Sequence, residues 1–80
     1  MIRTYLNPDF YIDVKPEVLE MVAPERQSFF RSLPPGEWVV PLDRITLLEI
    51  AWLIQNRKID ALAYDKQNLH IFFEEEPKVL

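Results

Sequence analysis

Carboxylates are the side chains that come closest to a chemical pattern in this sequence of 80 residues. Glu17 and Glu20 stand three residues apart, so in a helix they share a face. Paired carboxylates do acid–base work only in a cleft that separates their pKa values, and a short helix of an acidic chain favours a solvated face instead. Glu74, Glu75 and Glu76 carry oxygen ligands suited to a divalent cation, but successive strand residues point to opposite sides. Neither group predicts a catalytic or a metal site.

Histidine, serine, cysteine and glycine add no catalytic pattern. His70 could act as a general base, but its place between apolar strand residues favours a half-exposed histidine of a sheet. Ser28 and Ser32 fall in a predicted helix with nothing nearby in sequence to activate them. The lack of cysteine excludes disulfides and thiolate metal sites, and a single glycine excludes a phosphate-binding loop. We therefore expect no enzyme, no cofactor, no metal and no small-molecule substrate.

Charge and hydropathy argue against nucleic acid and membranes as partners. The net charge is −4, the nine Lys and Arg residues are scattered, and only Arg57 and Lys58 are adjacent. A nucleic-acid binder needs clustered cations to neutralise phosphates. The longest apolar run, 50–54, is far below the roughly 20 residues that cross a bilayer, and the first residues lack the apolar stretch of a signal peptide. We expect a cytoplasmic protein.

Prolines mark out the first two helices that must position these side chains. Pro16 and Pro24 are each followed by glutamate, and proline suits the first position of a helix because its missing N–H has no partner to lose. They predict helices over 16–22 and 24–33, and the Pro-Pro-Gly run at 34–36 ends the second.

The third helix carries the clearest start signal. Thr46 and Glu49 stand at the spacing of a capping box, in which the hydroxyl and the carboxylate each bind a backbone N–H at the helix start. They predict a helix over 46–58. Asp43 is an alternative cap, which would start the helix three residues earlier.

Short β-prone runs predict strands over 10–14, 38–40, 59–64 and 69–74. Pro41 closes the second run, which suits an edge or terminal strand, and four polar residues join the last two runs as a hairpin. The order is β-α-α-β-α-β-β in a single domain. The predicted class is α+β, with three helices on one face of a three- or four-stranded, mainly antiparallel sheet. The predicted core comprises Ile12, Leu19, Phe29, Phe30, Leu33, Trp38, Val40, Leu47, Ile50, Ala51, Ile54, Leu62, Ile71 and Phe73.

The helix over 46–58 has more apolar surface than one buried face requires. Its apolar side chains cover an arc of about 220°, whereas a surface helix needs about 100°. Burial beneath the first two helices is one explanation. The other is an exposed apolar patch around Trp52 and Leu53, with Glu49 and Arg57 on its rim. Because tryptophan is enriched at interfaces, these four residues are the predicted protein-interaction site.

The sequence therefore predicts a non-enzymatic protein–protein interaction module, such as a small regulatory, adaptor or accessory subunit, that binds a protein partner or forms a homodimer. A helix followed by a hairpin is also the second half of a winged helix. The alternative function is accordingly a DNA-binding regulator that reads DNA with helix 46–58 and uses 65–68 as the wing. Such a helix would offer the bases mainly leucine and isoleucine, and the charges of the wing cancel.

Overall fold

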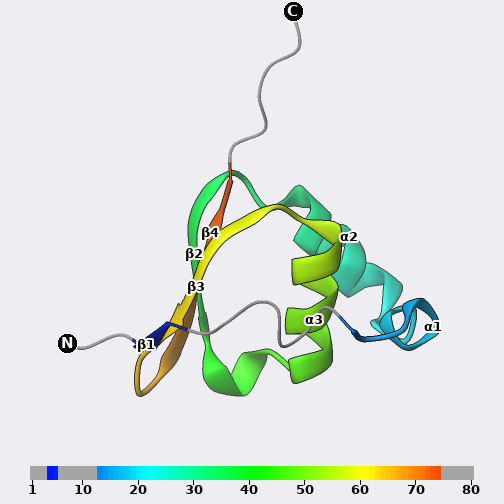
Figure 1. The fold of residues 1–80 in the computed structure, drawn as a ribbon, viewed down its shortest axis with the longest axis horizontal. Coiled ribbons are helices and arrows are strands. Elements are labelled where there is room, and N and C mark those ends of the chain that lie inside the picture. Colours follow the sequence, from blue (N-terminus) through cyan, green and yellow to red (C-terminus); the bar gives the residue numbers. More distant parts are fainter. Residues whose placement is uncertain (1–3, 6–12, 75–80) are drawn as a thin grey trace, which may run out of the picture.

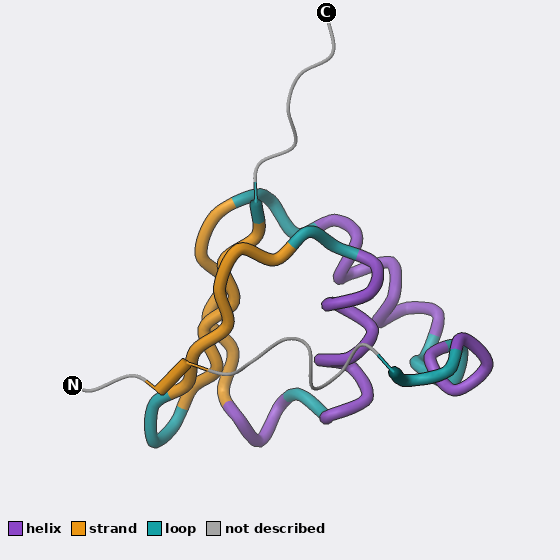
Figure 2. The backbone as a smooth tube through the Cα atoms, viewed as in Figure 1, coloured by secondary structure: helices purple, strands orange, loops and turns teal. Residues whose placement is uncertain are grey.

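Helices on one face of an antiparallel sheet make up the fold, and the predicted α+β class is confirmed (Figure 1). The computed structural model describes residues 4–5 and 13–74. The α-helices are α1 (Pro16–Leu19), α2 (Pro24–Ser32) and α3 (Leu47–Asn56), and the strands are β1 (Thr4–Tyr5), β2 (Gly36–Pro41), β3 (Ile59–Tyr64) and β4 (Asn68–Phe73). A 3-10 turn, η2 (Leu42–Arg44), follows β2. Figure 2 shows the strands on one side of the molecule and the helices on the other.

The strand order in the sheet is β1-β3-β4-β2, and every neighbouring pair is antiparallel. β4 lies between its hairpin partner β3 and the more distant β2, which it pairs over six residues. β2 is the last described strand on its side, so the edge strand predicted from Pro41 is confirmed. Of the strand predicted over 10–14, residues 10–12 lie outside the described residues. Asp13 and Val14 belong to the turn and loop before α1 instead.

The three helices begin where their sequence signals place them. Thr46 Oγ1 accepts from the Glu49 N–H at 3.0 Å, and the Glu49 carboxylate accepts from the Thr46 N–H at 2.9 Å, so the capping box is complete. Asp43, the alternative cap, lies in η2. Pro16 and Pro24 open α1 and α2. α1 ends three residues before the predicted end because its last bonds tighten to a spacing of three residues, which turns the chain.

An aromatic cluster joins α2 to the sheet and to α3. The Phe30 ring lies 6.0 Å from the Trp38 ring of β2 and 5.8 Å from the Trp52 ring of α3, measured between centroids. Trp38 in turn stacks on Phe73 of β4 at 6.4 Å. Phe30 has no exposed surface. Its side chain is therefore the point where α2, α3 and the sheet meet.

The core prediction is largely confirmed and wrong at two positions. Phe29 and Leu47 are 42% and 71% exposed, because Phe29 lies at the margin of the aromatic cluster and Leu47 is the first residue of α3. Ile12 lies outside the described residues. The prediction also missed five buried residues, namely Val22, Trp52, Leu53, Ala63 and Leu69.

Candidate functional site

The predicted interaction patch on α3 is core. Trp52 and Leu53 are 2% and 0% exposed, and Ile50 and Ala51 before them are also buried. Four consecutive helix residues point in directions about 100° apart, so the middle of α3 is enclosed on nearly every side. α1 and α2 cover the part of α3 that faces away from the sheet (Figure 1). The exposed patch is therefore a wrong prediction, and burial from within explains the wide apolar arc.

The two charged rim residues hold α3 to α2. Glu49 accepts a hydrogen bond from Arg26 Nε at 2.8 Å. Burial opposes ionisation of Glu49, but the bonds from Arg26 and Thr46 outweigh it, so the pKa of Glu49 lies below its usual value. Arg57 donates to the Phe30 carbonyl at the C-terminal end of α2 at 2.7 Å, and its guanidinium lies 4.2 Å from the centre of the Phe73 ring. The charged groups of Glu49 and Arg57 therefore make their contacts within the chain.

The enclosure of α3 also bears on DNA binding. A recognition helix must present an open side to the major groove, and the middle of α3 has none within the described structure. In the predicted wing, the Asp65 carboxylate is buried and bonded to its own hairpin. The winged-helix alternative gains no support from this arrangement.

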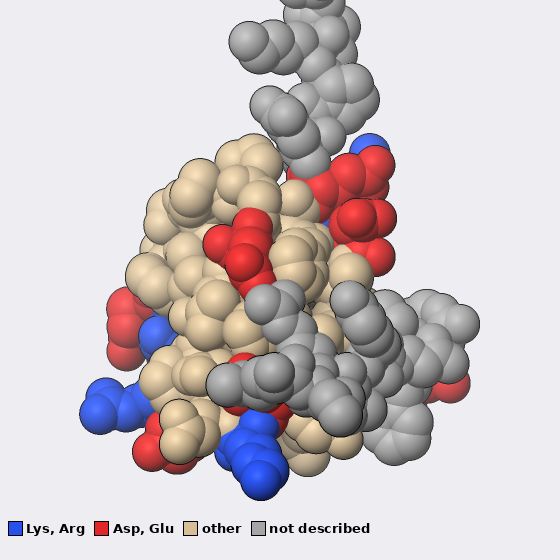
Figure 3. Space-filling view, turned by 90° about the vertical axis from the view of Figure 1, so that its left-hand side faces the viewer, with Lys and Arg blue, Asp and Glu red and all other residues tan. Residues whose placement is uncertain are grey.

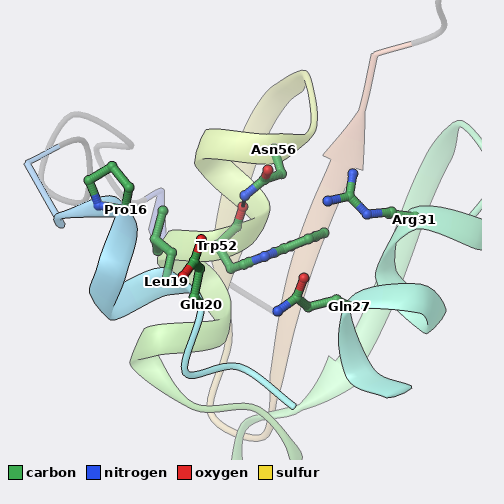
Figure 4. Close-up of a pocket in the computed structure, with 7 residues that line it drawn as sticks. All are labelled: Pro16, Leu19, Glu20, Gln27, Arg31, Trp52 and Asn56. Carbon is green, nitrogen blue, oxygen red and sulfur yellow. Dashed lines mark hydrogen bonds between the residues drawn. The ribbon is translucent and has the colours of Figure 1, made fainter. Parts of the chain in front are cut away.

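A groove of about 250 Å³ opens between the three helices (Figure 4). The Arg31 guanidinium covers the Trp52 ring at 4.9 Å. Asn56 Nδ2 donates to the Trp52 carbonyl and Gln27 Nε2 to the Val22 carbonyl. The groove carries one acidic and one basic side chain, Glu20 and Arg31, and the amide groups of Gln27 and Asn56 already donate to backbone carbonyls. It therefore has no convergent set of reactive groups. Its lining residues are Pro16, Leu19, Glu20, Gln27, Arg31, Trp52 and Asn56.

A histidine held between two carboxylates lies on the other side of the sheet. His70 Nε2 is 2.8 Å from Asp65 Oδ2, and His70 Nδ1 is 3.1 Å from Glu37 Oε2. Asp65 Oδ1 accepts from the N–H groups of Gln67 and Asn68. The hydrogen bonds to His70 and to these two N–H groups lower the pKa of Asp65 to about 2. Since the carboxylates lie at opposite ring nitrogens, they do not converge on one ion, and the described residues contain no metal-binding cluster.

This cluster was missed from the sequence, although one signal was available. An aspartate that opens a polar turn often accepts a hydrogen bond from the N–H two residues on, as Asp65 does. The contact between Glu37 and His70 depends on strand pairing, because Glu37 lies in β2 and His70 in β4. Asp65 reaches His70 from the turn before β4. The cluster therefore links β2 and the turn of the β3–β4 hairpin to β4.

Replacing Asp65 with asparagine is expected to reduce the acid sensitivity of the fold. Because the pKa of Asp65 is lowered from 3.8 to about 2, its charged form stabilises the fold above about pH 4, and this contribution is lost as the pH falls from about 4 to about 2. Thermal melts followed by circular dichroism should therefore show a lower midpoint at neutral pH and a shallower fall in that window. The exposed Asp43→Asn is the control. An unchanged fall for Asp65→Asn would contradict the assignment.

The backbone of β2 has an open edge at Val39. The Leu42 N–H donates to the Gln67 carbonyl at 2.9 Å, and this pair continues the register of β2 against β4. Hydrogen-bonded pairs alternate along an antiparallel ladder, so Trp38 and Val40 also direct their backbone groups toward β4. Val39 directs its N–H and C=O away from β4, to the side where no described strand lies. Neither group has a hydrogen-bond partner among the described residues.

Apolar side chains flank this edge on both faces of the sheet. Val39 is 45% exposed on the face away from the helices. On the helix face, the 42% exposed Phe29 packs edge-on against the half-buried Trp38, with 6.0 Å between ring centroids. Figure 3, seen from the sheet side, shows large uncharged areas on the described surface, with acidic and basic side chains between them. We call the outward backbone of Val39, with the side chains of Val39, Trp38 and Phe29, the β2 edge.

Comparison of the chain with known protein families, with curated proteins and with solved structures found no match. None of the helices in the described part of the chain is long and apolar enough to cross a membrane.

Proposed function

We propose that the protein is a non-enzymatic protein-binding module that accepts an extended segment of another polypeptide along the β2 edge. The observation that carries the proposal is the outward backbone of Val39 with an exposed apolar side chain on each face of the sheet. In strand addition, main-chain hydrogen bonds supply affinity, and alternate side chains of the added strand supply specificity. The lack of cysteine suits a reducing compartment, and we propose that the module acts in the cytoplasm.

The length and chemistry of β2 define the segment that it would accept. Pro41 has no N–H, so the pairing window ends there, and Gly36 begins the strand at the other end. The window suits about four or five residues of a partner. Partner side chains on the helix face would contact Phe29 and Trp38, where apolar residues fit, and those on the other face would contact Val39. Because the chain has a net charge of −4, a basic partner segment is favoured.

A rigid edge also favours binding. β2 is fixed to β4 along its whole length, and the Glu37 carboxylate reaches His70 on β4 at 3.1 Å. A partner strand would therefore order itself against an edge that is already in place, which lowers the entropy lost on binding.

The test is a selection of random decapeptides displayed on phage, followed by affinity measurements on two variants. Val39→Pro removes the outward N–H while the ladder to β4 stays intact, and Val39→Thr is the matched control that keeps the N–H and the side-chain shape. Loss of one hydrogen bond that leaves its acceptor unpaired costs about 1–3 kcal/mol, so the selected peptides should bind the proline variant about tenfold or more weakly. They should bind the threonine variant much as they bind the wild type.

Circular dichroism and amide spectra establish first that both variants fold. Selected peptides that bind the folded proline variant as tightly as the wild type would contradict strand addition at β2. A selection that enriches no peptide would do the same.

A further inference from the structure

We infer that the groove between the three helices binds a free α-amino acid with an apolar side chain. The inference goes beyond the proposed function, since none of the residues that line the groove belongs to the β2 edge. The volume of about 250 Å³ lies below the roughly 300–1,000 Å³ of sites for drug-sized ligands. A ligand of the size of a single amino acid therefore suits it.

The floor of the groove holds a hydrogen-bond donor without a partner. Trp52 is 2% exposed, and its Nε1–H makes no hydrogen bond in the part of the chain that the structure describes. Every fully buried side-chain nitrogen or oxygen among the described residues does have a partner, so this N–H reaches solvent, and it does so in the groove that Trp52 lines. Because a buried indole N–H usually finds a partner, an acceptor on a ligand would complete the site.

Opposite charges flank this donor. Figure 4 shows Glu20 of α1 on one side of the Trp52 ring and Arg31 of α2 on the other. The Arg31 guanidinium is held at the groove by the ring, 4.9 Å from its centre. Neither charged group takes part in an ion pair with any described residue. A guanidinium matches a carboxylate and a carboxylate matches an ammonium group, so the groove complements a molecule that carries both charges.

Gln27 adds an acceptor at the spacing that an amino acid requires. Its Nε2 donates to the Val22 carbonyl at 2.8 Å, which fixes the amide and leaves its oxygen toward the groove (Figure 4). Gln27 and Arg31 stand four apart on α2, so this acceptor and the guanidinium start about 5–6 Å apart on one helix face. The α-ammonium would donate to Gln27 and Glu20, while the α-carboxylate accepts from Arg31 and Trp52. The apolar side chain would lie against Leu19.

NMR titration of the full chain with L-alanine, L-valine, L-leucine and L-methionine tests the inference. The two tryptophans give two indole N–H signals, and Trp38→Phe identifies the signal of Trp52. At least one of these amino acids, at millimolar concentration, should shift the Trp52 signal and saturate it. Its amide derivative, which lacks the carboxylate, and its N-acetyl derivative, which lacks the ammonium group, should leave the signal in place. The inference is overturned if no amino acid gives a saturable shift, or if either derivative shifts the signal equally.

Two charge-removing variants locate the binding site. Arg31→Gln and Glu20→Gln each remove a charge-assisted hydrogen bond, so each should weaken binding of the amino acid about tenfold or more. Arg44→Gln and Glu17→Gln are the matched controls, because both side chains are exposed and neither lines the groove. The controls should bind like the wild type, and amide spectra should show that all four variants fold. Wild-type affinity in Arg31→Gln or in Glu20→Gln would overturn the inference.

Discussion

Leu53→Asp is expected to abolish folding. Leu53 has no exposed surface and lies among the apolar residues that α3 buries. A carboxylate without a partner in such a place costs several kcal/mol, and an 80-residue domain has a total stability of only about 4–12 kcal/mol. Circular dichroism should show loss of helix and strand signal. The double variant Trp52→Ala, Leu53→Asp should unfold in the same way.

The control for this prediction lies on the same helix. Leu47 is 71% exposed at the first position of α3, where a negative charge is favourable because it faces the positive end of the helix dipole. Leu47→Asp should therefore fold like the wild type. A folded Leu53→Asp would contradict the packing of α3 and restore the exposed interaction patch.

Phe30→Ala is expected to lower the free energy of unfolding by about 3–5 kcal/mol. The ring lies between Trp38 and Trp52 with no exposed surface, so its removal leaves a cavity where α2, α3 and the sheet meet. Phe29→Ala is the neighbouring control. Its ring is 42% exposed, so the loss should be about 1 kcal/mol.

Urea denaturation measures both variants. Equal losses for Phe29→Ala and Phe30→Ala would show that α2 is rotated from the orientation described here. The two variants should also differ in binding, because Phe29 belongs to the β2 edge and Phe30 does not. Phe29→Ala should weaken capture of selected peptides while the domain stays folded.

Local signals were sufficient to predict most of the elements. The capping box of Thr46 and Glu49 placed the start of α3, because its hydrogen bonds join residues only three apart. Pro16 and Pro24 placed the starts of α1 and α2 for an equally local reason. Pro41 indicated an edge strand, since proline has no N–H to donate to a strand on its outer side.

The candidate site was not predictable in the same way, because it depends on contacts distant in sequence. The apolar arc of α3 indicates how much of the helix surface must be buried, but not which element buries it. Trp52 was therefore assigned to an interface, although Phe30 and Arg31 of α2 pack against its ring. The openness of β2 likewise follows from the strand order, in which β4 lies between β3 and β2.

Amide hydrogen exchange at Val39, followed by NMR, tests the role of the β2 edge most directly. In dilute free protein the Val39 amide should exchange rapidly, while those of Trp38 and Val40, bonded to β4, should be protected. Addition of a selected peptide should protect Val39 and leave its two neighbours unchanged. A Val39 amide that exchanges equally fast in the free and the bound state would contradict strand pairing at β2.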